Sequence, residues 1–204
     1  EVNPRPQPVA AIILAAGASS RMGSPKPLLD CGGEAFLDRL ISVFSTSCDP
    51  VIAVLGHHAE QVREGISRAG QAAFVLNPDP DRGMVSSLQS GLAAVPARCR
   101  AVFFHPCDMP QIQPATIHTL IATLDAAPPA ILAAIPTLDG KRGHPVLIRA
   151  SWFPAFLALS SGSSARSLLE SAAGAVIEVP VADPGIRRDF DTRAEYAGAF
   201  GVRP

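Results

Sequence analysis

The sequence has few charged residues and little excess of either sign. Charged residues make up 17% of the 204 residues, and 17 Lys and Arg against 18 Asp and Glu leave a formal net charge of -1. This balance argues against a polycation that binds nucleic acid, and the 48% hydrophobic content argues against a disordered chain. The length and composition favour one globular domain with a substantial core.

Long apolar runs are also absent. The longest apolar stretch, Val9 to Ala16, is far shorter than the roughly 20 residues that cross a bilayer. No basic segment followed by an apolar one opens the chain, so we expect a cytoplasmic protein without a membrane partner. The proline-rich residues 1–8 are expected to be a disordered lead-in, and residues 9–204 a single domain.

The four cysteines contain no CxxC pair, which argues against a disulfide framework and against a zinc site. Two common phosphate-binding motifs are missing as well: the chain has neither G-x-x-x-x-G-K-[ST] nor G-x-G-x-x-G. The H-x-E and P-C-x-x-C elements of zinc deaminases are absent around "HPCDMP". Kinase-type, dinucleotide-binding and deaminase interpretations are therefore disfavoured.

What the chain does have is an alternation of short apolar runs with stretches of helical period. Residues 34–47 and 114–126 place apolar side chains on one stripe, as amphipathic helices do. Strand, helix and strand in repetition predict an α/β fold with a doubly wound, mostly parallel sheet in three layers. The expected strands are 9–16, 51–56, 72–77, 101–106, 130–136 and 175–181.

Residues 137–150 interrupt this alternation. A turn rich in Gly, Lys and Arg is followed there by a short strand, which predicts a hairpin or flap at the edge of the sheet. A second pair of helices is expected around residues 151–172.

The loop after the first strand, in "LAAGASSRMGSPKPLL" (14–29), combines small residues with two cations. Gly17 and Gly23 permit close backbone approaches, and successive exposed N–H groups form an anion site. Arg21 and Lys26 add the positive charge that holds phosphates. Because ligands of open α/β sheets bind at the carboxyl ends of strands, we expect this loop to bind a nucleoside triphosphate.

Carboxylates follow two other expected strands. Asp108 comes just after the fourth strand, and Asp189 and Asp191 come after the last one. A carboxylate beside a triphosphate is a natural ligand of Mg²⁺, which takes one or two carboxylates together with phosphate oxygens and water. The helix that begins near Met84 offers N–H groups and hydroxyls to a base or ribose.

The loop sequence resembles the LAAGxSxRMGxxKxLL signature of nucleotidyltransferases with a Rossmann-like fold, and most closely the molybdenum cofactor cytidylyltransferase group. The resemblance extends over residues 9–197. "HPCDMP" is similar to the family's CD-x-P, and "DFDT" to its D-x-D-T; both imply a metal site on Asp108 and Asp191. The nucleotide-binding residues expected on these grounds are Leu14, Ala15, Ala16, Gly17, Ser19, Arg21, Gly23, Lys26, Asn77, Gly83 and Ser87.

Two further motifs resemble the acceptor-binding part of the family. "GHP" implies acceptor contacts from Gly143, His144 and Pro145, and "SGSSARSLL" implies one from Arg166. Lys141 and Arg142 offer charge to a phosphate of the acceptor. The sequence departs from the family at Met109, where Gln is frequent, and at "RAEY", where P-E-D-L is expected.

The resemblance implies transfer of CMP from CTP to the phosphate of molybdopterin, with release of pyrophosphate and with Mg²⁺ as cofactor. Arg21 and Lys26 would stabilise the pentavalent phosphorus and the leaving group. Ala16 favours CTP, because the guanylyl branch has LAGG at this place. A molybdenum hydroxylase is a possible recipient of the product. The alternatives are GTP as donor, a sugar phosphate or another small phosphate as acceptor, and a non-catalytic carrier of the molybdenum cofactor.

Overall fold

One mixed sheet of eight strands forms the centre of the computed structural model, which describes residues 7–19, 22–160 and 162–201. Most of the expected lead-in, residues 1–6, lies outside the described part. The strand order is β3-β2-β1-β4-β7-β5-β6, and β8 pairs with β5. The strands are β1 (Val9–Ala15), β2 (Val51–Leu55), β3 (Ala73–Leu76), β4 (Ala101–Pro106), β5 (Ala133–Leu138), β6 (Lys141–Arg142), β7 (Val146–Arg149) and β8 (Val176–Pro180).

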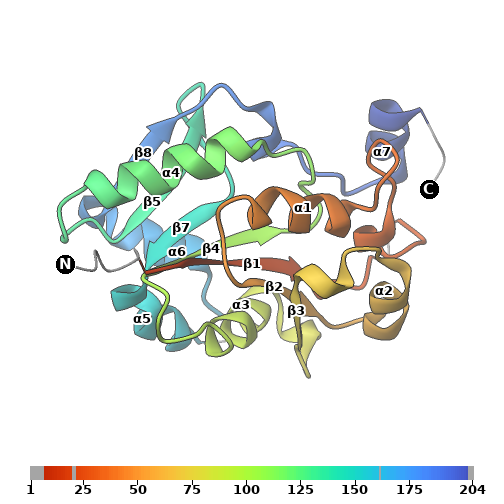
Figure 1. Cartoon of the computed structure of the whole chain (residues 1–204), viewed down its shortest axis with the longest axis horizontal. Coiled ribbons are helices and arrows are strands. Elements are labelled where there is room, and N and C mark those ends of the chain that lie inside the picture. The colour runs from red at the N-terminus through yellow and green to blue at the C-terminus, as the bar shows by residue number, and fades with distance from the viewer. Residues whose placement is uncertain (1–6, 20–21, 161, 202–204) are drawn as a thin grey trace, which may run out of the picture.

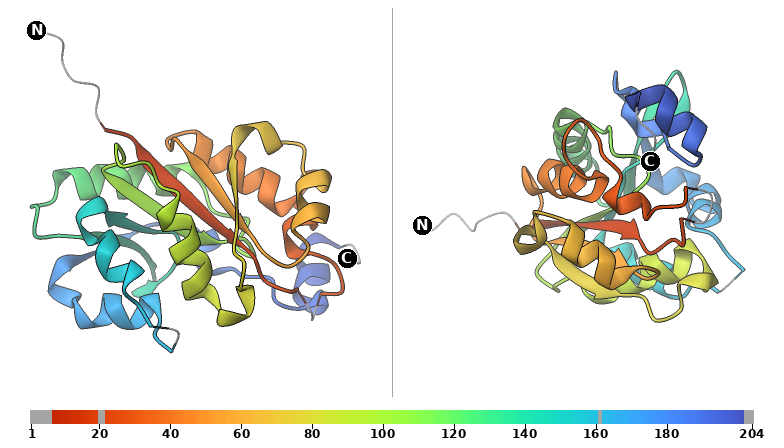
Figure 2. Two further views of the ribbon diagram at one scale, coloured as in Figure 1. Left: turned by 90° about the horizontal axis from the view of Figure 1, so that it is seen from below. Right: turned by 90° about the vertical axis from the view of Figure 1, so that its right-hand side faces the viewer.

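Helices cover both faces of this sheet (Figures 1 and 2). One face packs against α1, α2, α4 and α7, and the other against α3, α5 and α6. The α-helices are α1 (Phe36–Ser45), α2 (Ala59–Gly65), α3 (Met84–Ala93), α4 (Pro114–Ala126), α5 (Phe153–Leu157), α6 (Ala165–Ser171) and α7 (Arg193–Phe200). The predicted three-layer α/β fold is confirmed.

The two cores follow from the alternation of side chains along the strands. In β1, Ala11 and Ile13 pack in the core beneath α1 and α4, whereas Ile12 and Leu14 pack in the core beneath α3. A strand covered on both faces needs apolar residues at every position, which is why β1 is a continuous apolar run. None of the helices in the described part of the chain has the length and apolar character of a membrane span.

The predicted edge hairpin is partly wrong. β6 pairs with β5 as a hairpin, but β7 lies inside the sheet, antiparallel to β4 on one side and to β5 on the other. Val146, Leu147 and Ile148 are buried, and pairing on both sides satisfies the backbone N–H and C=O groups that an edge strand would leave unpaired. β5 also begins at Ala133 instead of residue 130, because the residues before it form a turn that the Ile131 N–H closes by donating to the Pro128 carbonyl at 2.9 Å.

The order of the strands reverses between β1 and β4. β1 leads by way of α1 to β2 on one side, and β4 lies on its other side, with both pairs parallel. The carboxyl ends of β1 and β4 are therefore neighbours, and the loops that follow them flank a crevice, as in other open α/β sheets. Asp108 and the glycine-rich loop meet at this point.

Candidate active site

The loop after β1 is folded around the main chain of Lys26. Ser19 has a positive φ of 54°, and its Oγ accepts a hydrogen bond from the Lys26 backbone N–H at 2.9 Å. The Met22 N–H donates to the Ser19 carbonyl at 3.0 Å. A left-handed serine is uncommon, and strained residues of this kind gather at ligand sites. Arg21, predicted to bind phosphates, lies outside the described residues.

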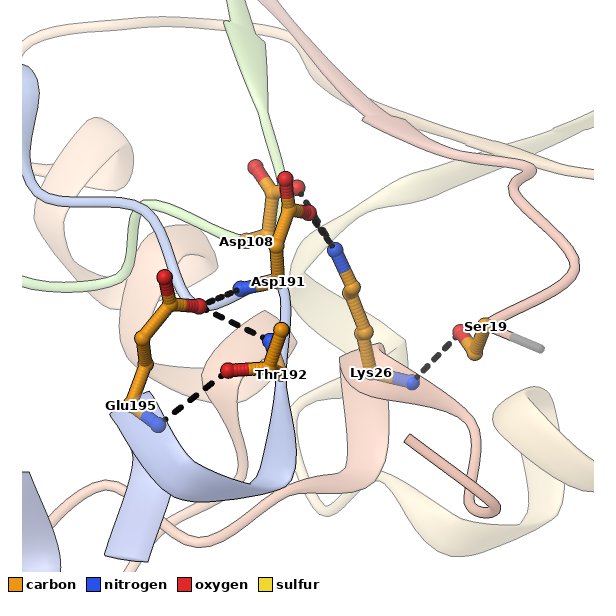
Figure 3. Close-up of polar contacts among 6 residues, drawn as sticks. All are labelled: Ser19, Lys26, Asp108, Asp191, Thr192 and Glu195. Atoms are coloured by element: carbon orange, nitrogen blue, oxygen red, sulfur yellow. Dashed lines mark hydrogen bonds and ion pairs between the residues drawn. The ribbon is translucent and has the colours of Figure 1, made fainter. Parts of the chain in front are cut away.

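Lys26 joins the two predicted metal ligands. Its Nζ lies 3.0 Å from Asp108 Oδ2 and 2.5 Å from Asp191 Oδ1, so three residues that are far apart in the sequence meet at one point (Figure 3). The cluster has one positive and two negative charges. Asp189, the alternative ligand, is exposed and does not line the cleft that contains Asp191.

Burial and pairing act in opposite directions on these charges. Burial disfavours the charged form of Lys26, but the carboxylates of Asp191 and Asp108 outweigh burial and raise its pKa. Burial raises the pKa of Asp108, and Lys26 only partly offsets this effect. Asp191 and Asp189 raise the Asp108 pKa further. Two carboxylates that repel each other and share one cation form a site that favours additional positive charge.

The backbone brings the two carboxylates together. The Phe190 N–H donates to the Asp108 carbonyl at 3.0 Å, which ties the segment before α7 to the turn after β4. At the start of α7, Glu195 Oε2 accepts from the N–H groups of Asp191 at 3.0 Å and Thr192 at 2.9 Å. The Thr192 Oγ1 accepts from the Glu195 N–H at 3.2 Å, which completes a capping box (Figure 3).

Glu195 was not among the predicted site residues, although the T-x-x-E spacing of a capping box is visible in "DTRAE". We expect Glu195→Ala to loosen Asp191 and to raise the metal concentration for half-maximal activity several-fold, while Glu195→Gln stays near wild type. A metal titration of both variants measures this. Equal titration curves for Glu195→Ala and the wild type would contradict it.

A cleft of about 300 Å³ lies beside the cluster. Most of the predicted nucleotide-binding residues line it, together with both carboxylates: Leu14, Ala15, Ala16, Gly17, Ser19, Lys26, Gly83, Ser87, Asp108 and Asp191. Two predicted residues do not. Asn77 is buried behind the wall and donates through Nδ2 to Ser86 Oγ and Ser87 Oγ, so it holds Ser87 in place. Gly23 packs against Arg193, and a Cβ there would lie 1.9 Å from the guanidinium.

A second cavity of about 570 Å³ adjoins the first and shares Leu14 and Met84 with it. Three of the four predicted acceptor residues, Gly143, His144 and Arg166, line this cavity. Pro145 is buried and is not part of the lining. Most of the wall is apolar, from Val85, Leu88, Phe104, Ile135, Val146 and Leu169.

Gly143 and His144 are fixed to the segment before α7. The His144 N–H donates to the Ile186 carbonyl at 2.8 Å, and a Cβ on Gly143 would lie 2.3 Å from the same oxygen. Only glycine allows this approach. The imidazole of His144 thereby reaches the cavity from a rigid backbone.

Cations surround the mouth of the second cavity. Arg142 pairs with Glu178 and Arg166 with Glu170, at 2.7 and 2.8 Å. Arg187, which sequence analysis missed, also lines the cavity. Arg187 lies at the end of a 3-10 turn, Pro184–Arg187, whose preceding Asp183 is buried and accepts from the Gly185 N–H at 2.9 Å. An apolar cavity with cations at its mouth fits a ligand that has an apolar body and an anionic group.

Two buried histidines make stability depend on pH. Burial lowers the pKa of His105 to about 3 and that of His144 to about 4, against an ordinary value near 6.5. Between pH 6.5 and about 4 the unfolded chain therefore binds more protons than the folded one. We expect the free energy of unfolding to decrease as the pH is lowered through this window. Each histidine contributes a decrease of up to about 1.4 kcal/mol per pH unit.

Urea unfolding of the wild type and of His144→Gln at pH 7, 5.5 and 4.5 tests this expectation. The variant should have the shallower decline. Parallel declines would contradict the neutral state of His144.

The chemistry of Asp108 and Asp191 suits a divalent ion. No group of three or more His, Cys, Asp or Glu within the described ranges is arranged to hold a metal ion. Two carboxylates are nevertheless enough for Mg²⁺, which keeps water ligands and takes phosphate oxygens from a substrate. Lys26 now lies where the carboxylates converge, so it must leave at least one of them when a metal binds.

Comparison with known proteins identifies the family of the chain. The family model described as the MobA-like NTP transferase domain matches residues 11–176, which is most of the chain. The chain belongs to this family. The matched residues contain most of β1, all of β2 to β7, the glycine-rich loop, Lys26, Asp108 and His144, whereas Asp191 and α7 lie beyond them.

Individual relatives of this MobA-like chain have different activities. It is 31% identical to the nicotine blue oxidoreductase of Paenarthrobacter nicotinovorans over 90% of this chain and 92% of that protein. It is 27% identical to the molybdenum cofactor cytidylyltransferase of Escherichia coli over 69% of each. The structure of Rv0371c from Mycobacterium tuberculosis superposes with a TM-score of 0.83 at 26% identity, over 97% of this chain and all of that one. A manganese complex of Rv0371c superposes at 0.79.

Proposed function

We propose that this MobA-like nucleotidyltransferase is a cytoplasmic enzyme that transfers CMP from CTP to the phosphate of molybdopterin and releases pyrophosphate. The observation that carries the proposal is the convergence of Lys26, Asp108 and Asp191 in a cleft that adjoins a second, larger cavity. A nucleotide and a phosphorylated acceptor in adjacent pockets have their reacting groups near the shared wall. The similarity to the Escherichia coli cytidylyltransferase supports the choice of substrates.

The residues of this chain bind the substrates and neutralise the charge of the phosphates, and none of them needs to act as a nucleophile. Small residues of the loop, from Ala15 to Ser19, leave backbone N–H groups free to face phosphates. Lys26 moves from the carboxylates to the oxygens of the triphosphate and stabilises the pyrophosphate as it leaves. Asp108 and Asp191 would hold Mg²⁺, which supplies charge stabilisation and alignment of the phosphates when bound.

Ala16 is the basis for CTP as donor. Its side chain lines the cleft and lies against the end of β2, since a Cβ on Gly56 would be 2.9 Å from Ala16 Cβ. A base that enters the cleft would lie between Ala16 and Ser87 of α3, both of which line it. We expect CTP to stabilise the protein in a thermal-shift comparison more than GTP. A larger shift with GTP would reverse the assignment.

One comparison favours a second candidate function. The nicotine blue oxidoreductase matches the chain over a longer region than the cytidylyltransferase does. An oxidoreductase activity, with its substrate in the apolar cavity beside Phe104 and His144, is therefore the main competitor. The paired carboxylates and Lys26 favour nucleotidyl transfer, because phosphoryl chemistry depends on charge stabilisation by cations and a divalent ion.

A single assay separates these candidates. The protein is incubated with each of the four nucleoside triphosphates, Mg²⁺ and molybdenum cofactor, and pyrophosphate is measured. Release with CTP that depends on the cofactor supports the proposal, and release with a sugar phosphate in its place supports the other acceptor class. No pyrophosphate release with any combination of triphosphate and acceptor, together with oxidoreductase activity on nicotine blue, would refute nucleotidyl transfer. If the protein binds the molybdenum cofactor but releases no pyrophosphate, the result supports the non-catalytic carrier.

A further inference from the structure

His105 occupies a position in β4 where an apolar residue is expected. It is fully buried, with an exposed fraction of 0%, and follows the apolar residues Val102, Phe103 and Phe104 in the strand. Its ring lies edge-on to Phe44 at 5.7 Å and to His144 at 6.3 Å between centroids. Packing alone would be satisfied by phenylalanine, which has a ring of similar size.

One ring nitrogen of His105 has a partner and the other has none. Nε2 lies 2.8 Å from the Met109 carbonyl oxygen. Because a carbonyl only accepts, Nε2 must bear the hydrogen, and Nδ1 is left as a bare acceptor. Within the described ranges, Nδ1 is the one buried side-chain nitrogen or oxygen without a hydrogen-bond partner. A buried unsatisfied group destabilises the folded state, so a compensating role for this histidine is expected.

The bond that His105 does make is to the turn that presents Asp108. Met109 is the next residue after Asp108, and its N–H also closes the turn by donating to Pro106 O at 3.4 Å. Two outer contacts hold the same turn: Arg39 Nε donates to the Pro110 carbonyl at 2.9 Å, and the Phe190 N–H donates to the Asp108 carbonyl. His105 makes a third contact with this turn, and it does so from strand β4 of the sheet.

We propose that His105 is a positioning residue, which acts through the Met109 carbonyl to hold the Asp108 carboxylate in register with Asp191. The inference rests on the proposed function in so far as Asp108 is taken as a metal ligand. The inference goes beyond the proposed function because it assigns a role to a residue outside the nucleotide and acceptor cavities. Removal of the imidazole eliminates the unsatisfied Nδ1 but leaves the Met109 carbonyl without its donor, so we expect a small change in stability together with weaker metal binding.

The test compares His105→Phe, which keeps the ring and removes the donor, with His105→Gln, whose Nε2 can donate from nearly the same place. His105→Leu is a second variant without a donor, in case the phenylalanine does not fit. His118→Phe on the exposed face of α4 is the control for loss of an imidazole. Each protein is measured for melting temperature, for Mn²⁺ binding by electron paramagnetic resonance with a non-hydrolysable CTP analogue, and for pyrophosphate release.

We expect His105→Phe to melt within a few degrees of the wild type, to bind Mn²⁺ at least 10-fold more weakly and to lose at least 10-fold in kcat, with KM for CTP within 3-fold. His105→Gln should restore Mn²⁺ binding to within 3-fold of wild type. Wild-type Mn²⁺ binding by His105→Phe or His105→Leu would overturn the inference. So would a loss in His105→Gln as large as that in His105→Phe. A wild type that binds Mn²⁺ but releases no pyrophosphate would refute the proposed function alone, since the binding comparison is independent of turnover.

Discussion

Lys26→Met lowers the rate of pyrophosphate release by about 10²–10³-fold and leaves the fold intact, if the site works as proposed. Loss of one preorganised group that stabilises developing charge typically has an effect of this size. The structure predicts an opposite effect on the metal. Lys26 Nζ now contacts both carboxylates, so without it Asp108 and Asp191 repel each other and are open to a cation. Mn²⁺ should therefore bind the nucleotide-free variant more tightly than the wild type.

The matched control for this variant is Lys141→Met, which removes a lysine from the mouth of the second cavity. It should leave metal binding unchanged. Steady-state kinetics and Mn²⁺ titration of both variants provide the two measurements. If Lys26→Met had full turnover, or bound Mn²⁺ no better than the wild type, the account of this lysine would be wrong.

Asp108→Asn should abolish most of the activity, with a loss of at least about 100-fold, while the melting temperature changes by only a few degrees. The loss follows because a neutral amide is a much weaker ligand for Mg²⁺ than a carboxylate. Stability is largely kept for two reasons. Burial already raises the pKa of Asp108, so its charge is unfavourable in the folded state, and Lys26 keeps Asp191 as a partner. The measurements are kcat as a function of Mg²⁺ and thermal unfolding.

Asp189→Asn is the control for Asp108→Asn, because Asp189 is exposed and outside the cleft. Its Mg²⁺ titration should match that of the wild type. Asp191→Asn should resemble Asp108→Asn. A loss in Asp189→Asn that equals the loss in Asp191→Asn would mean that the wrong carboxylate has been assigned.

The architecture was largely predictable because period and burial are visible in the sequence. β4 and α4 begin and end at the predicted residues, and the apolar run of β1 is buried along its whole length. The place of β7 was not predictable. Its residues are as apolar as those of a parallel strand, but its direction depends on the hairpin between β5 and β6, which a one-dimensional pattern does not reveal.

The candidate site divides in the same way. Lys26, Asp108 and Asp191 were predicted from motifs, and the structure brings them to one point. His105 and Glu195 were missed because they contact the backbone of other residues. The T-x-x-E spacing marks Glu195 as part of a helix cap but does not show that the cap holds Asp191, and no sequence pattern marks the contact of His105.

Asn77 shows the converse. Its type and its place after β3 favour a nucleotide contact, yet the side chain is used to hold two serines from behind the wall of the cleft. Which groups face a cavity and which support it depends on packing, and packing is what the sequence pattern does not give.

The most direct test of the central claim is a crystal structure with Mn²⁺ and a non-hydrolysable CTP analogue, in which anomalous scattering locates the metal. The account predicts one Mn²⁺ peak within bonding distance of Asp108 and Asp191, the triphosphate on the loop from Ala15 to Ser19, and Lys26 Nζ moved onto a phosphate oxygen. A peak elsewhere, with Lys26 still bound to both carboxylates and the loop without phosphate, would contradict it.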